Sequence, residues 1–321
     1  METPRRVLLI QLRAIGDVIL TTPALRVLKR RFPDAAVDFV SNPAPAEALV
    51  HNPHLRKIIV YPYAPHNAAG LLRFIFQLRK ERYDLVIDFL GTPATALIAL
   101  GSGAKTRVGY NLRLRRFAYT HRETGYRGDI YNALTKFSLL KSLGIDEEES
   151  RTEIFLSPES ETWAQQQFLK LGLAGASVAA LAPKAKRPFR QWLPERFAEI
   201  ADYVQERGHR VLIIWGPGEE EFARSVGNRM RLAPVIAPRT TLLQSAALLR
   251  LCRLLIGNCG GARHIAAAVG TATLTVHGPT DPRVWTPPDD PRHAFVRAAS
   301  QRVEDVTVAQ VVAALEAMRI L

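Results

Sequence analysis

Short apolar runs alternate with amphipathic stretches along the first half of the chain. Runs with the length and composition of buried strands lie at 6–11, 37–40, 57–60 and 84–90. Stretches with apolar residues at helical spacing lie at 17–32, 70–82 and 93–100. Because strands and helices alternate, we predict a parallel sheet with helices on both faces.

A basic, aromatic-rich segment at 107–129 interrupts this pattern, and we predict that it forms a functional surface region. A further helix is predicted at about 130–143. The stretch at 144–160 is acidic and polar and ends in Ser-Pro-Glu-Ser, which is typical of a domain boundary. We therefore predict two domains, at 1–150 and 151–321.

The alternation restarts in the second half of the chain. Predicted strands lie at 177–183, 210–216, 234–237, 253–257 and 271–278. Predicted helices lie at 194–208, 219–229, 241–250 and from about 261. Two Rossmann-like α/β domains that face a cleft are the predicted architecture, with ligands bound at the carboxyl ends of the strands.

Composition and charge narrow the choice of partner. The chain has 321 residues, of which 47% are hydrophobic and 23% charged, so it is neither disordered nor collagen-like. Lys and Arg exceed Asp and Glu by 43 to 30, which gives a net charge of +13. Such a balance favours an anionic partner: nucleic acid, a membrane surface, or a phosphorylated or carboxylated substrate. No nucleic-acid-binding module is recognisable, so we predict no nucleic acid partner.

The cysteine content and the hydrophobic runs indicate a cytoplasmic protein. Cys252 and Cys259 are the two cysteines, too few for a disulfide scaffold. The first residues lack the apolar core of a signal peptide, and no segment approaches about 18 uninterrupted apolar residues. Any contact with the inner membrane is therefore expected to be peripheral, on the cytoplasmic face.

The first predicted strand leads through Gly16, in a tight turn, to Asp17. An Asp at this position has two interpretations: a helix cap, or a general base beside a substrate hydroxyl. The turn holds one glycine and is therefore not a dinucleotide-binding motif.

A paired glycine, Gly260 and Gly261, leads from a predicted strand into a helix. Backbone N–H groups at such a helix start form a site for phosphate, and we predict a diphosphate site here. Cys259 is alternatively a small buried residue and His264 a satisfied polar group. No His, Cys or acidic spacing suits a metal, so metal-free chemistry is predicted and no cofactor is expected.

Four charged clusters complete the candidate chemistry. Lys184, Lys186, Arg187 and Arg190 follow a strand and can neutralise a phosphate leaving group. Acidic residues at 219–221 either complement the helix dipole or accept hydrogen bonds from a ribose. Basic residues at 26–31, and Arg113, Arg115 and Arg116, either contact an acidic acceptor or membrane headgroups, or form solvated faces.

An ordered set of motifs resembles the bacterial heptosyltransferases of glycosyltransferase family nine. The motifs are GDVILTTPAL, YDLVIDFLG, SGAKTRVGY, RQWLPERFAEIA, IIWGPGEEE and GNCGGARHIAAAVGTATLTVHGPTDP, and the likeness covers nearly the whole chain. The resemblance implies a glycosyltransferase B-type fold, an acceptor-binding N-terminal domain, a C-terminal domain that binds a nucleotide sugar, and metal-free inversion. It also implies ADP-heptose as donor and the Kdo-containing inner core of lipopolysaccharide, or a heptose attached to it, as acceptor.

The resemblance assigns roles to individual residues. It makes Asp17 the catalytic base. On the donor side it places Arg190, Glu220, Gly261, His264, Thr280 and the positions of Cys259 and Gly260. From the basic clusters we add Lys186 to the predicted donor side and predict Arg13, Arg113, Arg115 and Arg116 on the acceptor side. Arg190 replaces a lysine, and Cys259 and Gly260 replace the Asp and the Ser or Thr of the family. The last two changes remove groups that accept hydrogen bonds from sugar hydroxyls.

Two functions of different class follow. The first is an inverting glycosyltransferase in which Asp17 deprotonates an acceptor hydroxyl and the nucleoside diphosphate leaves. The second, motivated by Cys259 and Gly260, is a homologue that binds a nucleotide sugar or glycan without transfer, or that uses another donor.

Overall fold

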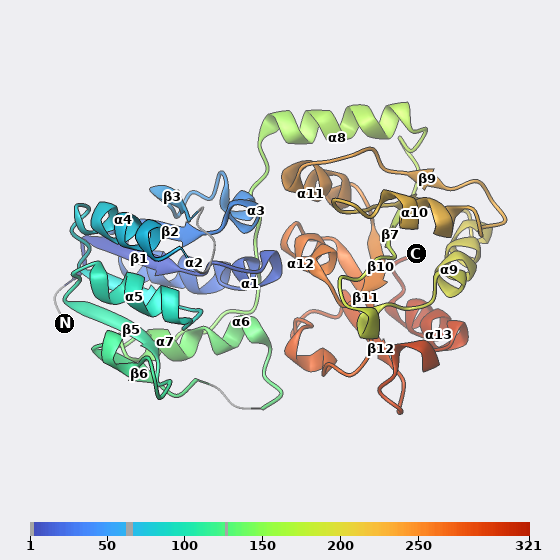
Figure 1. Cartoon of the computed structure of the whole chain (residues 1–321). Helices are drawn as coiled ribbons and strands as arrows, with labels where there is room; N and C mark the ends of the chain where they lie inside the picture. Colours follow the sequence, from blue (N-terminus) through green and yellow to red (C-terminus); the bar gives the residue numbers. More distant parts are fainter. Residues whose placement is uncertain (1–2, 62–66, 126–127) are drawn as a thin grey trace. The chain divides into compact units, whose positions relative to one another are not determined.

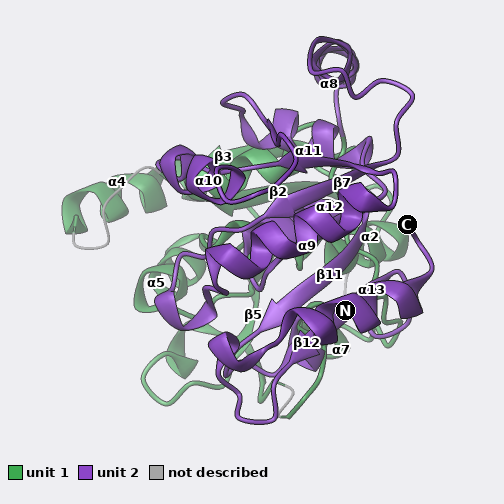
Figure 2. Cartoon of the chain, turned by 90° about the vertical axis from the view of Figure 1, so that its right-hand side faces the viewer, with its two compact units in different colours: residues 1–155 green, residues 156–321 purple. Residues whose placement is uncertain are grey.

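The computed structural model describes residues 3–61, 67–125 and 128–321. The chain forms two compact units, Met1–Phe155 and Leu156–Leu321 (Figure 2). The division falls within the polar segment that separates the two alternating patterns, a few residues beyond the predicted boundary of 150–151.

Unit 1 contains a six-stranded parallel sheet with the strand order β3-β2-β1-β4-β5-β6 (Figure 1). The strands are β1 (Arg6–Ile10), β2 (Ala36–Ser41), β3 (Lys57–Val60), β4 (Leu85–Asp88), β5 (Thr106–Tyr110) and β6 (His121–Glu123). The chain order reverses between β1 and β4, where ligands bind in open α/β sheets, at the carboxyl ends of the strands.

Helices cover both faces of this sheet. They are α1 (Ile15–Ile19), α2 (Thr22–Arg31), α3 (Pro43–Ala46), α4 (Ala68–Arg79), α5 (Pro93–Gly101), α6 (Asn132–Thr135) and α7 (Phe137–Lys141), with 3-10 turns η1 (Glu47–Leu49) and η2 (Arg116–Ala118). Successive residues of β1 point to opposite faces, so Val7 and Leu9 enter one core and Leu8 and Ile10 the other. A strand buried on both faces explains the continuous apolar run in the sequence.

Unit 2 repeats this architecture with the strand order β12-β11-β10-β7-β8-β9. The strands are β7 (Val178–Ala182), β8 (Arg210–Ile213), β9 (Val235–Ile236), β10 (Leu254–Asn258), β11 (Ala272–His277) and β12 (His293–Arg297). The helices are α8 (Pro158–Lys170), α9 (Pro194–Glu206), α10 (Glu220–Gly227), α11 (Leu242–Arg250), α12 (Gly261–Ala268) and α13 (Val308–Met318), with 3-10 turns η3 (Pro188–Arg190), η4 (Pro282–Val284) and η5 (Val303–Asp305). The two parallel sheets confirm the predicted pair of Rossmann-like folds.

Several predicted boundaries were wrong. The helix predicted at 17–32 is split into α1 and α2, because the hydroxyls of Thr21 and Thr22 bond back to Val18 O and Ile19 O, and Pro23 lacks an amide hydrogen. The segment at 107–129, in which no strand was predicted, supplies most of β5 and all of β6. The helix predicted at 130–143 is the short pair α6 and α7, and α8, β12 and α13 had not been predicted.

In the described part of the chain, no helix combines the length and the apolar character needed to cross a bilayer.

Candidate functional site

Asp17 lies in α1, immediately after β1 at the carboxyl edge of the unit 1 sheet. Its Oδ2 accepts a hydrogen bond from the Ala14 amide at 3.0 Å, so the carboxylate does cap the first turn. Oδ1 makes no hydrogen bond with another described residue, and the side chain is half-buried. Asp17 is therefore held in place through one oxygen while the other stays available. Gly16 lies within helix α1 and does not form the predicted tight turn.

Asp88 ends β4 and lies in register with Ile10 of β1. Its side chain is fully buried. Oδ1 accepts hydrogen bonds from the amides of Leu90 and Gly91 at 2.9 and 3.0 Å, and Oδ2 accepts one from the Tyr119 hydroxyl at 2.7 Å. Burial raises the pKa of Asp88 despite these donors. The carboxyl group ties the β4–α5 loop to the edge of the sheet.

Lys136, at the junction of α6 and α7, has a buried side chain that is 7% exposed. Its ammonium group makes no hydrogen bond or ion pair with another described residue. Burial lowers the pKa of Lys136, whereas the nearby carboxylates of Asp17 and Asp88 favour its charged form. The structure thus brings one cation and two carboxyl groups together at the carboxyl edge of β1 and β4.

Polar atoms without partners surround this edge. Gln11 Oε1 follows β1, and Ser41 Oγ and Asn42 Oδ1 lie at the end of β2; all three are buried and accept or donate no hydrogen bond in the described structure. Buried polar atoms are nearly always hydrogen-bonded in folded proteins. Buried polar atoms without such bonds, at the carboxyl edge of a sheet, are suited to hydrogen-bond a polar ligand.

The four arginines predicted on the acceptor side divide into two kinds. Arg115 is half-buried, its Nη1 donates to Gly91 O at 3.0 Å, and its buried Nε has no partner in the described structure. Arg115 therefore points toward the β4–α5 loop and the edge described above. Arg13, Arg113 and Arg116 are exposed, and their side chains make no hydrogen bond or ion pair with a described residue.

The donor-side cluster of unit 2 begins with the loop between β7 and α9. Gln191 clamps the loop: its Oε1 accepts from the Ala185 amide at 2.7 Å, and its Nε2 donates to Pro183 O at 2.6 Å. Asn258, at the end of β10, accepts from the Trp192 amide at 2.8 Å and donates to Pro183 O at 2.7 Å. The loop that carries Lys186 and Arg190 is thus tied to the sheet.

Gly278 allows this loop to approach the end of β11. A Cβ atom at Gly278 would lie 2.5 Å from Phe189 O, which no side chain tolerates. The close approach brings Arg190 beside the segment that contains Thr280. Arg190 Nε and Thr280 Oγ1 are both buried and have no hydrogen-bond partner in the described structure. A donor and a hydroxyl therefore remain available at this edge.

Helix α12 begins at Gly261 with Gly260 as its N-cap, and no side chain of a described residue caps it. No heavy atom of the described structure lies within 4 Å of a Cβ built at Gly261, and neither glycine has a positive φ. The space next to the helix start is open, as a phosphate site at free N–H groups requires. Cys259 is buried at 3% exposure, in accord with its interpretation as a small buried residue.

Two buried histidines and an arginine adjoin this helix start. Burial lowers the pKa of His264 well below its usual value, and the Arg263 and Arg190 charges add to the effect. His277 Nε2 lies 3.4 Å from Arg263 Nη1, and burial, with Arg263 and Arg190, lowers the pKa of His277 to about 3. Both imidazoles are therefore neutral at pH 7, and the guanidinium groups of Arg190 and Arg263 carry the positive charge.

The carboxylates of the acidic turn at 219–221 have different partners. Glu219 Oε2 accepts from the Gly216 amide at 2.9 Å and so lies over the turn. Glu220 pairs with Arg224 at 2.7 Å on the surface of α10, at 46% side-chain exposure. An i, i+4 pair of this kind is a weak, solvent-exposed contact. Glu219, one position before the predicted Glu220, is therefore the acidic residue that contacts the turn at Gly216.

Comparison with known proteins identifies the family. The sequence model of Glycosyltransferase family 9 (heptosyltransferase) matches residues 71–311. This chain belongs to glycosyltransferase family 9. Among its relatives, lipopolysaccharide heptosyltransferase 3 of Escherichia coli is 26% identical over 289 residues, which cover 86% of this chain and 84% of that protein. Lipopolysaccharide heptosyltransferase 1 of Escherichia coli K12 is 24% identical, with coverage of 86% and 89%.

Solved structures of glycosyltransferase family 9 share the fold. The family 9 glycosyl transferase of Veillonella parvula matches with a TM-score of 0.92 at 24% identity, covering 99% of this chain and 98% of that one. The Escherichia coli heptosyltransferase WaaC, solved with ADP-2-deoxy-2-fluoro heptose, matches with a TM-score of 0.77 at 22% identity, covering 97% and 99%. The glycosyltransferase B-type α/β fold and the enzyme class predicted from the sequence are confirmed.

Three residues of this glycosyltransferase were missed by the sequence reasoning. Asp88 and Lys136 occur within apolar stretches, where a charged residue is itself a signal, and Arg263 lies on the small-residue helix after Gly261. Charged side chains are almost never fully buried unless they are paired. A lysine or arginine inside an otherwise apolar face could therefore have been singled out.

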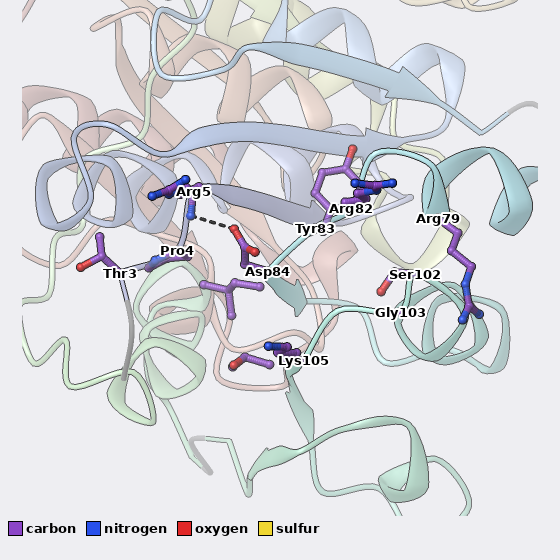
Figure 3. A pocket seen from close by; sticks show the side chains of 12 residues that line it. Thr3, Pro4, Arg5, Arg79, Arg82, Tyr83, Asp84, Ser102, Gly103 and Lys105 are labelled. Carbon is purple, nitrogen blue, oxygen red and sulfur yellow. Dashed lines mark hydrogen bonds between the residues drawn. The ribbon is translucent and has the colours of Figure 1, made fainter.

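A pocket lies at the opposite, amino-terminal edge of the unit 1 sheet (Figure 3). It has a volume of about 850 Å³, and four basic side chains contribute to its lining: Arg5, Arg79, Arg82 and Lys105. Asp84 accepts hydrogen bonds there from the backbone amides of Arg5 and Arg6 at 2.8 and 2.9 Å. Because the predicted site residues gather at the carboxyl edge, this pocket is separate from the candidate site. Among the described residues, no group of three His, Cys, Asp or Glu is arranged to hold a metal.

Proposed function

We propose that this family 9 glycosyltransferase moves a heptose from ADP-heptose to the inner core of lipopolysaccharide, with inversion and without a metal ion. Support for the substrates comes from relatives named lipopolysaccharide heptosyltransferases, which align over most of both chains, and from WaaC, solved with a fluorinated ADP-heptose analogue. The observation that carries the proposal is the set of polar and charged groups at the carboxyl edges of both sheets that have no partner among the described residues.

Asp17 is the proposed general base. Its free oxygen takes the proton of an acceptor hydroxyl as that oxygen attacks the anomeric carbon, and the bond from that carbon to the diphosphate breaks. Attack from the side opposite the leaving group inverts the anomeric centre. Lys136 is proposed as a positioning residue, because its buried ammonium attracts the Asp17 carboxylate.

The leaving diphosphate gains negative charge as the bond breaks. We assign its stabilisation to Arg190, Arg263 and the free amides at the start of α12. These groups offer the positive charge that a divalent cation supplies in other nucleotide sites. Thr280 Oγ1 and Glu219 or Glu220 are proposed to bind hydroxyls of the donor, with Lys186 at the rim of the site.

A second function is motivated by Cys259 and Gly260, which replace the Asp and the Ser or Thr of the family. These residues offer no side-chain oxygen to a sugar hydroxyl, so a different donor, or binding without transfer, is the competing hypothesis.

Isothermal titration with ADP-heptose, ADP and UDP- and GDP-sugars distinguishes these functions. Selective binding of ADP-heptose supports the proposal. Preference for another nucleotide sugar would keep the enzyme class and overturn the donor. Absence of binding to every nucleotide would favour the second function.

A further inference from the structure

Most large exposed apolar side chains of unit 1 belong to α4, α5 and the segment that leads into η2. Helices α4 and α5 pack side by side, and η2 packs against α5 (Figure 1). The large exposed apolar residues of α4, α5 and the segment 112–118 are Leu72, Phe76, Leu97, Leu100, Leu112, Leu114 and Phe117, and we call this surface the α4–α5–η2 face. Phe76 is 67% exposed and Leu114 is 80% exposed. In unit 2 the exposed large apolar side chains are scattered over separate elements and loops.

The face is also basic. The segments 67–80, 92–107 and 111–122 contain no Asp or Glu. Their exposed cations are Arg73, Arg79, Lys80, Lys105, Arg113, Arg116 and Arg122. None forms an ion pair with a described residue, and of these side chains Arg122 alone hydrogen-bonds to a described residue, donating from Nε to Tyr119 O at 3.3 Å. On α4, Leu72, Phe76 and Lys80 follow at four-residue spacing and so share one side of the helix. Apolar and cationic side chains therefore alternate on the same surface.

On the basic helix α2, by contrast, two arginines are paired with carboxylates of the same chain. On α2, Arg26 pairs with Glu149 and Glu153, and Arg30 pairs with Glu147 and Glu149. These two arginines, predicted to contact an acidic acceptor or membrane headgroups or to form a solvated face, are instead paired with the chain's own acidic segment at 147–153. The cations of the α4–α5–η2 face form no ion pair with a described carboxylate, and Asp84, in the pocket that Arg79 and Lys105 line, accepts hydrogen bonds from the backbone amides of Arg5 and Arg6.

We propose that the α4–α5–η2 face binds the surface of an anionic lipid bilayer. Exposed apolar side chains interleaved with Lys and Arg are the chemistry of an interfacial surface, in which the apolar groups enter the headgroup boundary and the cations contact lipid phosphates. The basic pocket at the ends of α4 and α5, which shares Arg79 and Lys105 with the face, offers room for a headgroup phosphate (Figure 3). A second copy of the chain is a poor occupant, since two such faces repel each other.

Flotation of the purified protein with vesicles tests this proposal without donor or acceptor. We expect binding to vesicles of equal parts phosphatidylcholine and phosphatidylglycerol, little binding to phosphatidylcholine alone, and weakening by salt. The double variant Leu72→Gln/Phe76→Gln should bind at least about tenfold more weakly. Arg73→Gln/Lys80→Gln should lose about tenfold at low salt. The matched control Leu169→Gln, on α8 at the same 67% exposure as Phe76, should bind as the parent does.

A labelled variant keeps the test independent of folding defects. Cys252 and Cys259 are buried, so an environment-sensitive dye attaches selectively to Phe76→Cys or to Leu169→Cys. Mixed vesicles should shift the emission of the dye at position 76 to the blue and leave that at 169 unchanged. Equal shifts at both positions, equal binding to the two vesicle types, or no binding by the parent protein would overturn the proposal. So would a self-associated protein that Leu72→Gln/Phe76→Gln disperses, which would make the face an interface between copies.

The residues varied in these tests, Leu72, Arg73, Phe76 and Lys80, have no assigned part in the transfer reaction, whereas Arg113 and Arg116 of the face are also predicted acceptor-side residues. Vesicle binding without sugar transfer would refute the proposed function alone, and transfer to a lipid-free acceptor without vesicle binding would refute the bilayer surface alone.

Discussion

Individual charged residues define the candidate site, and their surroundings decide what each does. The Asp17 carboxylate both caps α1 and keeps one oxygen free, so the capping and catalytic interpretations are compatible. Lys136 carries its ammonium in a buried position without a hydrogen bond to a described residue. Burying an unpaired charge costs stability, and such costs are typically retained where function needs the charge.

Replacing the base separates the two roles of Asp17. In Asp17→Asn the amide oxygen still accepts the Ala14 hydrogen bond, so the fold should be kept while proton transfer is lost. We expect kcat for sugar transfer to fall by about 10² to 10⁴, with the Kd for ADP unchanged. Steady-state kinetics and calorimetry measure the two quantities. Asp34→Asn, at an exposed carboxylate, is the control, and parent-like kcat in Asp17→Asn would reject the assignment.

Lys136→Met should make the protein more stable and less active. The pKa of Lys136 is lowered in the folded state, so between that value and 10.5 the unfolded chain binds more protons and stability rises with pH. Met has no charge to bury. The free energy of unfolding of Lys136→Met should therefore exceed that of the parent protein most at neutral pH, and the difference should shrink toward pH 10. Without the cation near Asp17, the acid limb of the kcat/KM profile should move to higher pH. Lys141→Met, on the exposed side of α7, should change neither quantity, and an unmoved profile in Lys136→Met would refute the positioning role.

Strand and helix elements were largely predictable from the sequence, whereas short interruptions were not. Buried parallel strands give continuous apolar runs, and these located all but three strands: β5 and β6, inside the basic segment at 107–129, and β12. The break between α1 and α2 depends on two threonine hydroxyls that bond to carbonyl oxygens, which periodicity does not detect. The position of Arg190 next to Thr280 depends on a tertiary contact at Gly278, so sequence order alone could not supply it.

A substitution at Asn258 tests whether the contact between β10 and the loop after β7 holds Arg190 in position. Asn258→Ala leaves the buried Trp192 amide without its acceptor and removes a donor to Pro183 O. We expect the free energy of unfolding to fall by about 2 kcal/mol and the Kd for ADP to rise, because the loop is no longer held to β10. Denaturant titration and calorimetry measure these effects. Asn228→Ala, at an exposed position after α10, is the control, and equal effects of the two substitutions would contradict the account.

At the scale of the whole molecule, the unfolding of unit 2 can be measured separately from that of unit 1. All four tryptophans, Trp163, Trp192, Trp215 and Trp285, belong to unit 2, so intrinsic fluorescence reports the unfolding of that unit. Unit 2 also contains the buried neutral histidines, and unit 1 the candidate base. Acid should therefore act first on the unit assigned to the donor.

The pH dependence of unit 2 follows from His277 and His293. Burial lowers their pKa values to about 3 and about 4, against 6.5 in the unfolded chain. Between pH 7 and 5 the unfolded state takes up protons that the folded state does not, so each histidine removes about 2 kcal/mol of stability. Urea titration followed by tryptophan fluorescence should show a lower midpoint at pH 5, and a smaller change in His277→Gln. An unchanged midpoint in the parent would contradict the buried, neutral state of these side chains.

The central claim is that this family 9 enzyme transfers heptose from ADP-heptose to a lipopolysaccharide inner core with Asp17 as base. The most direct measurement is the mass of a heptose-free, Kdo-containing core acceptor after incubation with ADP-heptose and the parent protein or Asp17→Asn. We predict that the parent adds one heptose and releases one ADP per acceptor, and that the variant produces almost none. An acceptor of unchanged mass with the parent, or the same product from Asp17→Asn at the parent rate, would contradict the account.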